Sequence, residues 1–177
     1  PDAPMFGLGY SLGACMLVKY LGTVGENTPM KGGISASNPW DPWRVSLHLR
    51  GVGAESNFVK NVYNMHFVSA LKRMFKENED IFQSYRPDLN YEIVNKCKTV
   101  EEFDNLVTLP YLRDTHGSKA IFESVETLYS AMRCSEELAK VKVPLLVAHA
   151  LDDPVVPCSV LPMDALHNNE HVFYLET

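Results

Sequence analysis

The sequence predicts an α/β fold with about four parallel strands and a helical insertion. Two observations carry this prediction. Apolar segments of strand length alternate with helical periodicity near both ends of the chain, whereas residues 51–142 hold helical patterns and no convincing strand. Right-handed crossovers between parallel strands account for the alternation. We expect a core formed by residues 1–50 and 143–177, and a helical lid insertion with return helices over residues 51–142.

The first elements read as strand, sharp turn and helix. Met5–Tyr10 is apolar and of strand length, and Leu12–Leu21 is a run of good helix formers followed by Gly22. Glycine is common just past a helix end, so we expect the helix to stop there. Lys31–Ser37 predicts a second, buried strand, since a proline-rich segment closes it.

The insertion holds the clearest helix of the sequence. Apolar residues recur every three or four positions over Ser56–Lys76, which predicts an amphipathic helix. Thr99 and Glu102 form a capping box that opens a short helix, and Pro110 is expected to close it. Residues 122–132 give another helical stripe.

The remaining elements return to the strand pattern. Val143–Ala150 is a continuous apolar run, which is typical of a fully buried parallel strand. Pro162–Leu166 predicts a short helix, and His171–Leu175 a final strand. Because no neighbour is expected beyond Met5–Tyr10, we predict a raw sheet edge there and poor solubility of the chain alone.

Composition excludes several classes of function. The chain has 177 residues, of which 46% are hydrophobic and 21% charged, with a net charge of −6. An acidic balance without a run of Lys and Arg argues against a nucleic-acid partner or an anionic membrane surface. The longest apolar stretch, Met5–Val18, is shorter than the roughly 20 residues of a membrane helix, so no membrane anchor is visible in the sequence.

The cysteines indicate a compartment. They lie far apart without a C-x-x-C pair, which fits neither a zinc site nor a small disulfide framework. We therefore expect an intracellular, reducing compartment, with any membrane anchor in a part of the protein before Pro1. The four positions are Cys15, Cys97, Cys134 and Cys158.

The motif that carries chemistry is Gly9-Tyr10-Ser11-Leu12-Gly13, which fits G-x-S-x-G between a strand and a helix. A serine at such a turn takes a strained backbone that lifts its hydroxyl clear of the sheet, and flanking glycines remove side chains that would collide. The Leu12 amide would then point at a developing oxyanion. The alternative is a glycine-rich turn with a capping serine and no catalytic role.

A dinucleotide-binding fingerprint is a competing interpretation of the same glycines. The G-x-G-x-x-G pattern requires glycine at position 12, where this chain has Leu12. It also requires an acidic residue about twenty positions after the glycines. Neither requirement is met.

A serine nucleophile needs a base, and the base needs an orienting carboxylate, which follow the serine in the order acid, then histidine. Asp152 and Asp153 come directly after the apolar run that ends at Ala150. A loop at the carboxyl end of a parallel strand lies on the same edge as the serine turn. Pro154 restrains the backbone of Asp153, so Asp153 is our candidate and Asp152 the second choice.

Several segments resemble one family. The segments are GLGYSLGACMLVKYLG, SASNPWDPW, KTVEEFDNLVT, ELAKVKVPLLVAHALDDPVVP and HVFYLET. Together they resemble the YheT-type (Emb8-like) esterase and lipase branch of the α/β-hydrolases. The resemblance implies the C-terminal half of an α/β-hydrolase fold, with Ser11 as nucleophile, Asp153 as triad acid and Leu12 as one oxyanion amide. It also implies acyl esters, including acylglycerols and phospholipids, as substrates.

In that family the triad histidine follows the last strand, in a Gly-Gly-His stretch, whereas this chain stops at Thr177. We therefore expect the base beyond the chain end and the piece alone to be inactive. His167 and His171 follow the acid in the right order and remain candidates for the base. As a metal pair they lack a third ligand, so we expect no metal and no cofactor. His149 is expected to be a satisfied core histidine.

The sequence thus predicts a serine esterase or lipase whose partner is a small-molecule acyl ester or lipid. The alternative is a non-catalytic module that binds acyl or lipid ligands, because the base and the second oxyanion donor are missing from the chain.

Overall fold

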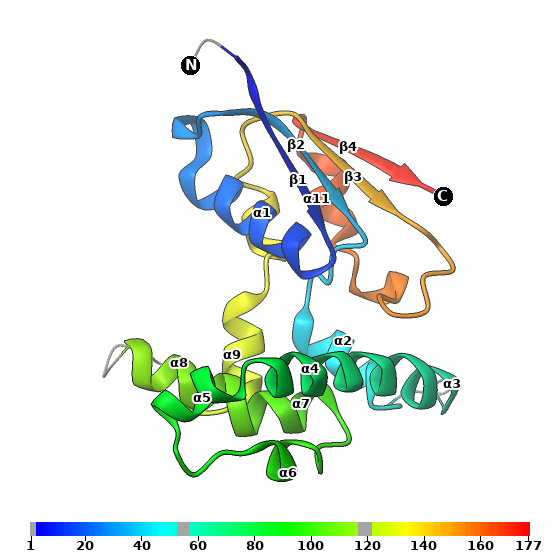
Figure 1. Cartoon of the computed structure of the whole chain (residues 1–177). Helices are drawn as coiled ribbons and strands as arrows, with labels where there is room; N and C mark the ends of the chain where they lie inside the picture. Colours follow the sequence, from blue (N-terminus) through cyan, green and yellow to red (C-terminus); the bar gives the residue numbers. More distant parts are fainter. Residues whose placement is uncertain (1–2, 53–56, 117–121) are drawn as a thin grey trace. The chain divides into compact units, whose positions relative to one another are not determined.

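The computed structural model describes residues 3–52, 57–116 and 122–177. They divide into two compact units (Figure 1): unit 1 comprises Pro1–Val45 and Tyr129–Thr177, and unit 2 comprises Ser46–Leu128. The helix α2 (Pro42–Leu49) leads out of unit 1 and α9 (Val125–Met132) leads back into it.

Unit 1 is an α/β layer. Its strands are β1 (Met5–Tyr10), β2 (Met30–Ala36), β3 (Leu145–His149) and β4 (Val172–Glu176), and its further helices are α1 (Leu12–Val24), α10 (Ser135–Leu138) and α11 (Met163–Asn168). The four strands form one sheet in the order β1-β2-β3-β4, and every neighbouring pair is parallel (Figure 1). This confirms the predicted α/β class with four parallel strands, and β1 is an edge strand as expected.

One face of the sheet is covered by helices. A side chain at Gly7 or Gly33 would meet Leu17 of α1, so α1 lies directly on this face of β1 and β2. The short helix α11 packs beside β4, and the Asn169 side-chain amide after it donates to the carbonyls of Leu138 and Val141. These contacts join α10, α11 and the start of β4.

The opposite face exposes apolar side chains. The register aligns Leu8 of β1 with Ile34 of β2, and Leu146 of β3 with Phe173 of β4, so these residues share one face. Phe6 and Leu8 are 67% and 59% exposed. We call this the apolar sheet face; its exposed large side chains are Phe6, Leu8, Tyr10, Ile34, Phe173 and Leu175.

The end of α1 differs from the prediction. The helix continues through Gly22 to Val24 and ends at Gly25, which has φ 58°. Gly22 is buried against α10, where a side chain would overlap the carbonyl oxygen of Glu137. The predicted stop at Gly22 is wrong because this glycine serves helix packing rather than termination.

The secondary-structure elements of unit 2 are all helical in its described residues. Its elements are α3 (Asn57–Val59), α4 (Met65–Glu77), α5 (Glu79–Tyr85), α6 (Tyr91–Val94), α7 (Val100–Phe103) and α8 (Leu109–His116). The long helix predicted over Ser56–Lys76 is present from Asn57 onward, with a π-helical turn at Lys60–Asn64 between α3 and α4. Ser56 lies outside the described residues.

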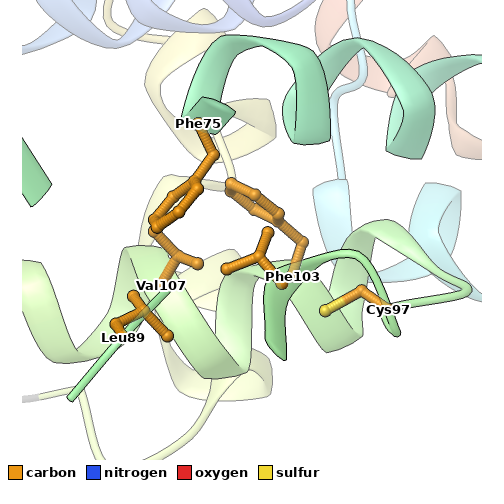
Figure 2. Packing of buried hydrophobic residues seen from close by; sticks show 6 residues of the cluster. Phe75, Leu89, Cys97, Phe103 and Val107 are labelled. Atoms are coloured by element: carbon orange, nitrogen blue, oxygen red, sulfur yellow. The ribbon is translucent and has the colours of Figure 1, made fainter. Parts of the chain in front are cut away.

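A compact hydrophobic core holds unit 2 together (Figure 2). Phe103 is 1% exposed, and the Phe75 and Phe82 rings stack with centroids 4.7 Å apart. Asn64, buried in the π-helical turn, donates to the Lys98 carbonyl and accepts from the Val100 N–H. The buried residues of the core are Phe75, Leu89, Val94, Cys97, Phe103 and Val107.

The Thr99 cap is present, but Glu102 bonds the N–H of Lys98 instead of Thr99, and the helix that Thr99 opens does not close at Pro110. The Thr99 hydroxyl accepts from the Glu102 N–H at 3.1 Å, and the Glu102 carboxylate accepts from the Lys98 N–H at 2.6 Å. A π-helical turn at Asp104–Thr108 leads straight from α7 into α8. This turn widens the helix just before Pro110, which relieves the clash of the proline ring with the preceding turn.

The stripe predicted over residues 122–132 forms α9 only from Val125 onward. Where the chain re-enters unit 1, the Cys134 N–H donates to the Trp40 carbonyl at 3.3 Å, and the rings of Trp43 and Tyr129 lie 6.5 Å apart. The outgoing and returning segments are therefore fastened to each other within unit 1.

Candidate active site

Ser11 stands at the turn between β1 and α1 with φ 49° and ψ −123°. Its N–H donates to the Ala36 carbonyl at 3.0 Å, and its carbonyl accepts from the N–H groups of Ala14 and Cys15. A positive φ is unfavourable for a non-glycine residue and persists only where surrounding contacts hold it. The side chain of Ser11 is exposed. The structure thus shows the strained strand-to-helix turn that the motif predicts.

Ser11 occupies the N-cap position of α1, but its side chain makes no capping hydrogen bond with the described residues. The first amides of a helix have no acceptor inside the helix, so the N–H of Leu12 is directed out of the helix end. The missing capping bond contradicts the alternative interpretation, in which Ser11 is a capping serine in a glycine-rich turn.

The two glycines of the motif have different roles. A side chain at Gly9 would lie 2.6 Å from the Cα of Ala14, so β1 and α1 approach each other too closely for any other residue. A side chain at Gly13 would meet no described atom within 4 Å. The expectation that both glycines prevent collisions is confirmed for Gly9 and wrong for Gly13.

Asp153 lies in the loop after β3. Its Oδ1 accepts from the N–H groups of Val155 at 2.9 Å and Val156 at 3.0 Å, and its own N–H donates to the Ala150 carbonyl. The half-buried side chain is thereby fixed in direction, with Oδ2 left as the oxygen for another donor. Asp152, the second choice, is exposed.

The edge of the sheet brings these groups to one side of unit 1. Ser11 follows β1, Ser37 follows β2 and Asp153 comes after β3, and all strands run in the same direction. Ser37 also has a positive φ, 46°, and its N–H donates to the Ala148 carbonyl. Sequence reasoning missed Ser37, because no local motif surrounds it.

The two candidate bases lie at the other end of the strands. The His171 carbonyl accepts from the N–H of Leu145, the first residue of β3, so His171 precedes β4 at the amino edge of the sheet. His167 belongs to α11, which also leads into that edge. The structure therefore separates both histidines from Ser11 and Asp153.

His149 ends β3 at the carboxyl edge and is 2% exposed. Neither of its ring nitrogens has a hydrogen-bond partner among the described residues. It is a core histidine, as expected, but the expectation that it is satisfied is wrong.

Among the described residues, no group of three His, Cys, Asp or Glu side chains could hold a metal ion. None of the described helices is both long and apolar enough to cross a membrane.

Comparisons with known proteins indicate the class of protein to which the chain is similar. The chain aligns over 99% of its length, at 29% identity, with an embryogenesis-associated protein EMB8 from Picea glauca. It aligns over its whole length with a monoacylglycerol lipase from Saccharomyces cerevisiae at 26% identity, and over 97% with phospholipase ABHD3 from Homo sapiens at 23%. The curated relatives are thus α/β-hydrolases, and they confirm the resemblance to the Emb8-like branch.

The coverage of these relatives is partial, since the chain spans 36–38% of their length. No protein-family model matches the chain. Among solved structures, a monoacylglycerol lipase from Paleococcus ferrophilus covers 98% of this chain at 13% identity, with a TM-score of 0.46 and 58% of its own length matched.

Proposed function

We propose that this chain carries the nucleophile and the acid of a serine hydrolase that acts on acyl esters, of the carboxylesterase or lipase type. The observation that carries the proposal is the backbone of Ser11, with φ 49° and ψ −123° at a strand-to-helix turn and an exposed side chain. Lipases, esterases and phospholipases among the relatives support an ester or lipid substrate.

In this proposal the Ser11 Oγ attacks the ester carbonyl while an imidazole accepts its proton. The Oδ2 of Asp153 accepts from the other ring nitrogen and fixes its tautomer, because Oδ1 is already held by backbone N–H groups. The Leu12 N–H stabilises the oxyanion of the tetrahedral intermediate. The alcohol leaves, and water then releases the acyl group as a carboxylic acid.

The imidazole is the part of the proposal that unit 1 does not supply, since His167 and His171 lie at the opposite edge of the sheet and His149 is a core residue only 2% exposed. A triad histidine beyond Thr177, and inactivity of the 177-residue piece alone, stay predictions. A lid role for the helical insertion, predicted with its return helices over residues 51–142, stays a prediction as well.

A fluorophosphonate probe tests the nucleophile in the parent protein, because such probes react with activated serines. We expect labelling of the wild type and none of Ser11→Ala. Ser37→Ala is the matched control: Ser37 ends the neighbouring strand and also has a positive φ, yet labelling should persist. Labelling that survives Ser11→Ala, or that disappears in Ser37→Ala alone, would overturn the assignment.

A second candidate is a non-catalytic module for acyl or lipid ligands. Its supporting observation is an exposed apolar helix surface in unit 2, which includes Val62 and Met65. A parent protein that binds a fluorescent fatty acid but neither reacts with the probe nor hydrolyses an acyl ester would favour this candidate.

A further inference from the structure

The helix that runs from α3 through the π-helical turn into α4 has one face that the packing of unit 2 explains. Val59, Val68 and Phe75 are buried, and α4 packs on α6 and α7. These buried residues recur at helical spacing, so they account for part of the apolar pattern that the sequence shows over Ser56–Lys76. They do not account for all of its apolar residues.

A second row of apolar side chains lies on the exposed side of the same helix. Phe58, Val62 and Met65 are 65%, 44% and 58% exposed and follow one another at spacings of four and three residues. The side chains of Val62, Met65 and Ser69 border the same open surface. Single exposed apolar residues need no explanation, whereas a contiguous apolar row marks an interaction surface.

The exposed row continues into basic residues. Spacings of four and three residues lead from Ser69 to Arg73 and Lys76, and both basic side chains are exposed. The Arg73 guanidinium has no ion pair with any described residue. The Lys76 ammonium lies 5.1 Å from the centroid of the Tyr91 ring. We call this row the α4 face; it comprises Phe58, Val62, Met65, Ser69, Arg73 and Lys76.

The sign of the charge sets this helix apart from the chain as a whole. Residues 57–77 hold four of the 16 basic residues and one of the 22 acidic residues, whereas the whole chain carries a net charge of −6. The overall balance argues against an anionic surface, but exposed charges act only within about 8 Å at physiological ionic strength. The attraction at the α4 face therefore depends on its own basic residues.

We propose that the α4 face binds an anionic lipid surface. Phe58, Val62 and Met65 enter the boundary between headgroups and acyl chains, and Arg73 contacts the anionic headgroups. Apolar burial and attraction by anionic lipid act together in helices of this composition. Nucleic acid would leave the apolar row in water. The choice of lipid over an acidic protein rests on the proposed function, because that function places the substrate in a lipid phase.

A fluorescent reporter on the α4 face of the parent protein tests the proposal. Val62→Cys carries a polarity-sensitive dye, with Cys158 and any further reactive cysteine changed to serine, since Cys15, Cys97 and Cys134 are buried. The protein is titrated with vesicles of phosphatidylcholine, or of phosphatidylcholine and phosphatidylserine in a two-to-one ratio. We expect a blue shift with the anionic vesicles that weakens as salt is added, and a smaller shift with the neutral ones.

Three results would overturn the proposal. The first is a dye that stays in water with both kinds of vesicle. The second is a dye that is already shielded before lipid is added, because another part of the protein then covers the α4 face. The third is an equal response to neutral and anionic vesicles.

Charge variants of the reporter protein locate the attraction. Arg73→Gln should raise the anionic lipid concentration at half-maximal shift about fivefold, the usual contribution of one basic side chain at such a surface. Arg73→Lys should remain near the wild type. Lys96→Gln is the matched control, since Lys96 is exposed and lies between α6 and α7, on which the opposite face of α4 packs. An equal loss in Arg73→Gln and Lys96→Gln would contradict a local site.

The reporter titration is separable from the proposed function when it is carried out in a Ser11→Ala background, where no vesicle lipid is consumed. A reporter that responds to anionic lipid in a protein that fluorophosphonate does not label supports this inference and counts against the hydrolase. Labelling without a reporter response supports the hydrolase and overturns the lipid surface.

Discussion

Replacing Gly9 by alanine tests whether the close approach of β1 and α1 holds Ser11 in its strained backbone. The new Cβ would lie 2.6 Å from the Cα and 2.7 Å from the backbone nitrogen of Ala14. These are backbone atoms, so no rotamer change can relieve the overlap. The helix must move away from the strand, and the turn that carries Ser11 must move with it.

The magnitude follows from two opposing effects. Overpacking of this kind costs about 1–3 kcal/mol, and removal of a glycine from a strand returns about 0.5–1 kcal/mol. We expect a net loss of about 1–2 kcal/mol, which corresponds to a melting temperature lower by roughly 2–8 °C for a chain of this size.

Gly13→Ala is the matched control, since its Cβ would meet no described atom within 4 Å. Alanine in place of glycine in a helix stabilises it by up to about 1 kcal/mol, so this variant should melt at or above the wild-type temperature. Thermal unfolding is followed by circular dichroism, and fluorophosphonate labelling is measured in the parent protein. Shifts of the same sign in both variants, or wild-type labelling of Gly9→Ala, would refute the reasoning.

Three further predictions concern unit 2. Phe103→Ala, in the centre of the core, should lower the free energy of unfolding by about 3–5 kcal/mol in urea titrations, and a loss below about 1 kcal/mol would contradict the packing described. Thr99→Ala removes the cap on the Glu102 N–H and should cost about 1 kcal/mol, whereas Thr99→Ser should not. The hydrogen-bonded Arg86 guanidinium holds the pKa of the Asp88 carboxyl below its ordinary value, so its stabilising contribution should be complete above the ordinary Asp pKa and disappear as the pH falls through the lowered one. An NMR titration in which Asp88 protonates at or above the ordinary Asp pKa would contradict this.

Local signals in the sequence were enough to predict several elements of the fold. The strand at Met5–Tyr10 was predicted with its observed bounds, because a short apolar run between a turn and a helix leaves few other choices. The helix start at Leu12 follows from the same motif. The capping pair of Thr99 and Glu102 is likewise local, since both partners lie within one helical turn.

Features that depend on distant segments could not be predicted. Gly22 is predicted to end a helix, because its packing against Glu137 cannot be seen in the sequence. Pro110 is predicted to end a helix, because the π-helical turn before it cannot be seen in the sequence either. The hydrogen bond from the Cys15 thiol to the Met132 carbonyl depends on how the chain returns from α9, and no spacing rule applies to it.

The candidate site divides in the same way. Ser11 and Asp153 could be chosen from short motifs, because each follows a strand of a parallel sheet. The separation of His171 from them also follows from the predicted parallel sheet, since the first residue of a parallel strand lies at the edge opposite the last one. The lack of a hydrogen-bond partner for the His149 ring among the described residues could not be predicted, since it depends on burial in the folded unit.

The backbone angles at residue 11 have one more consequence. Glycine would adopt φ 49° and ψ −123° without penalty, so Ser11→Gly should make unit 1 more stable by about 1 kcal/mol, whereas Ser11→Ala should leave the cost in place. The molecule therefore folds in spite of the Cβ at this position, and a stability screen blind to reactivity would discard the side chain on which the proposed chemistry depends.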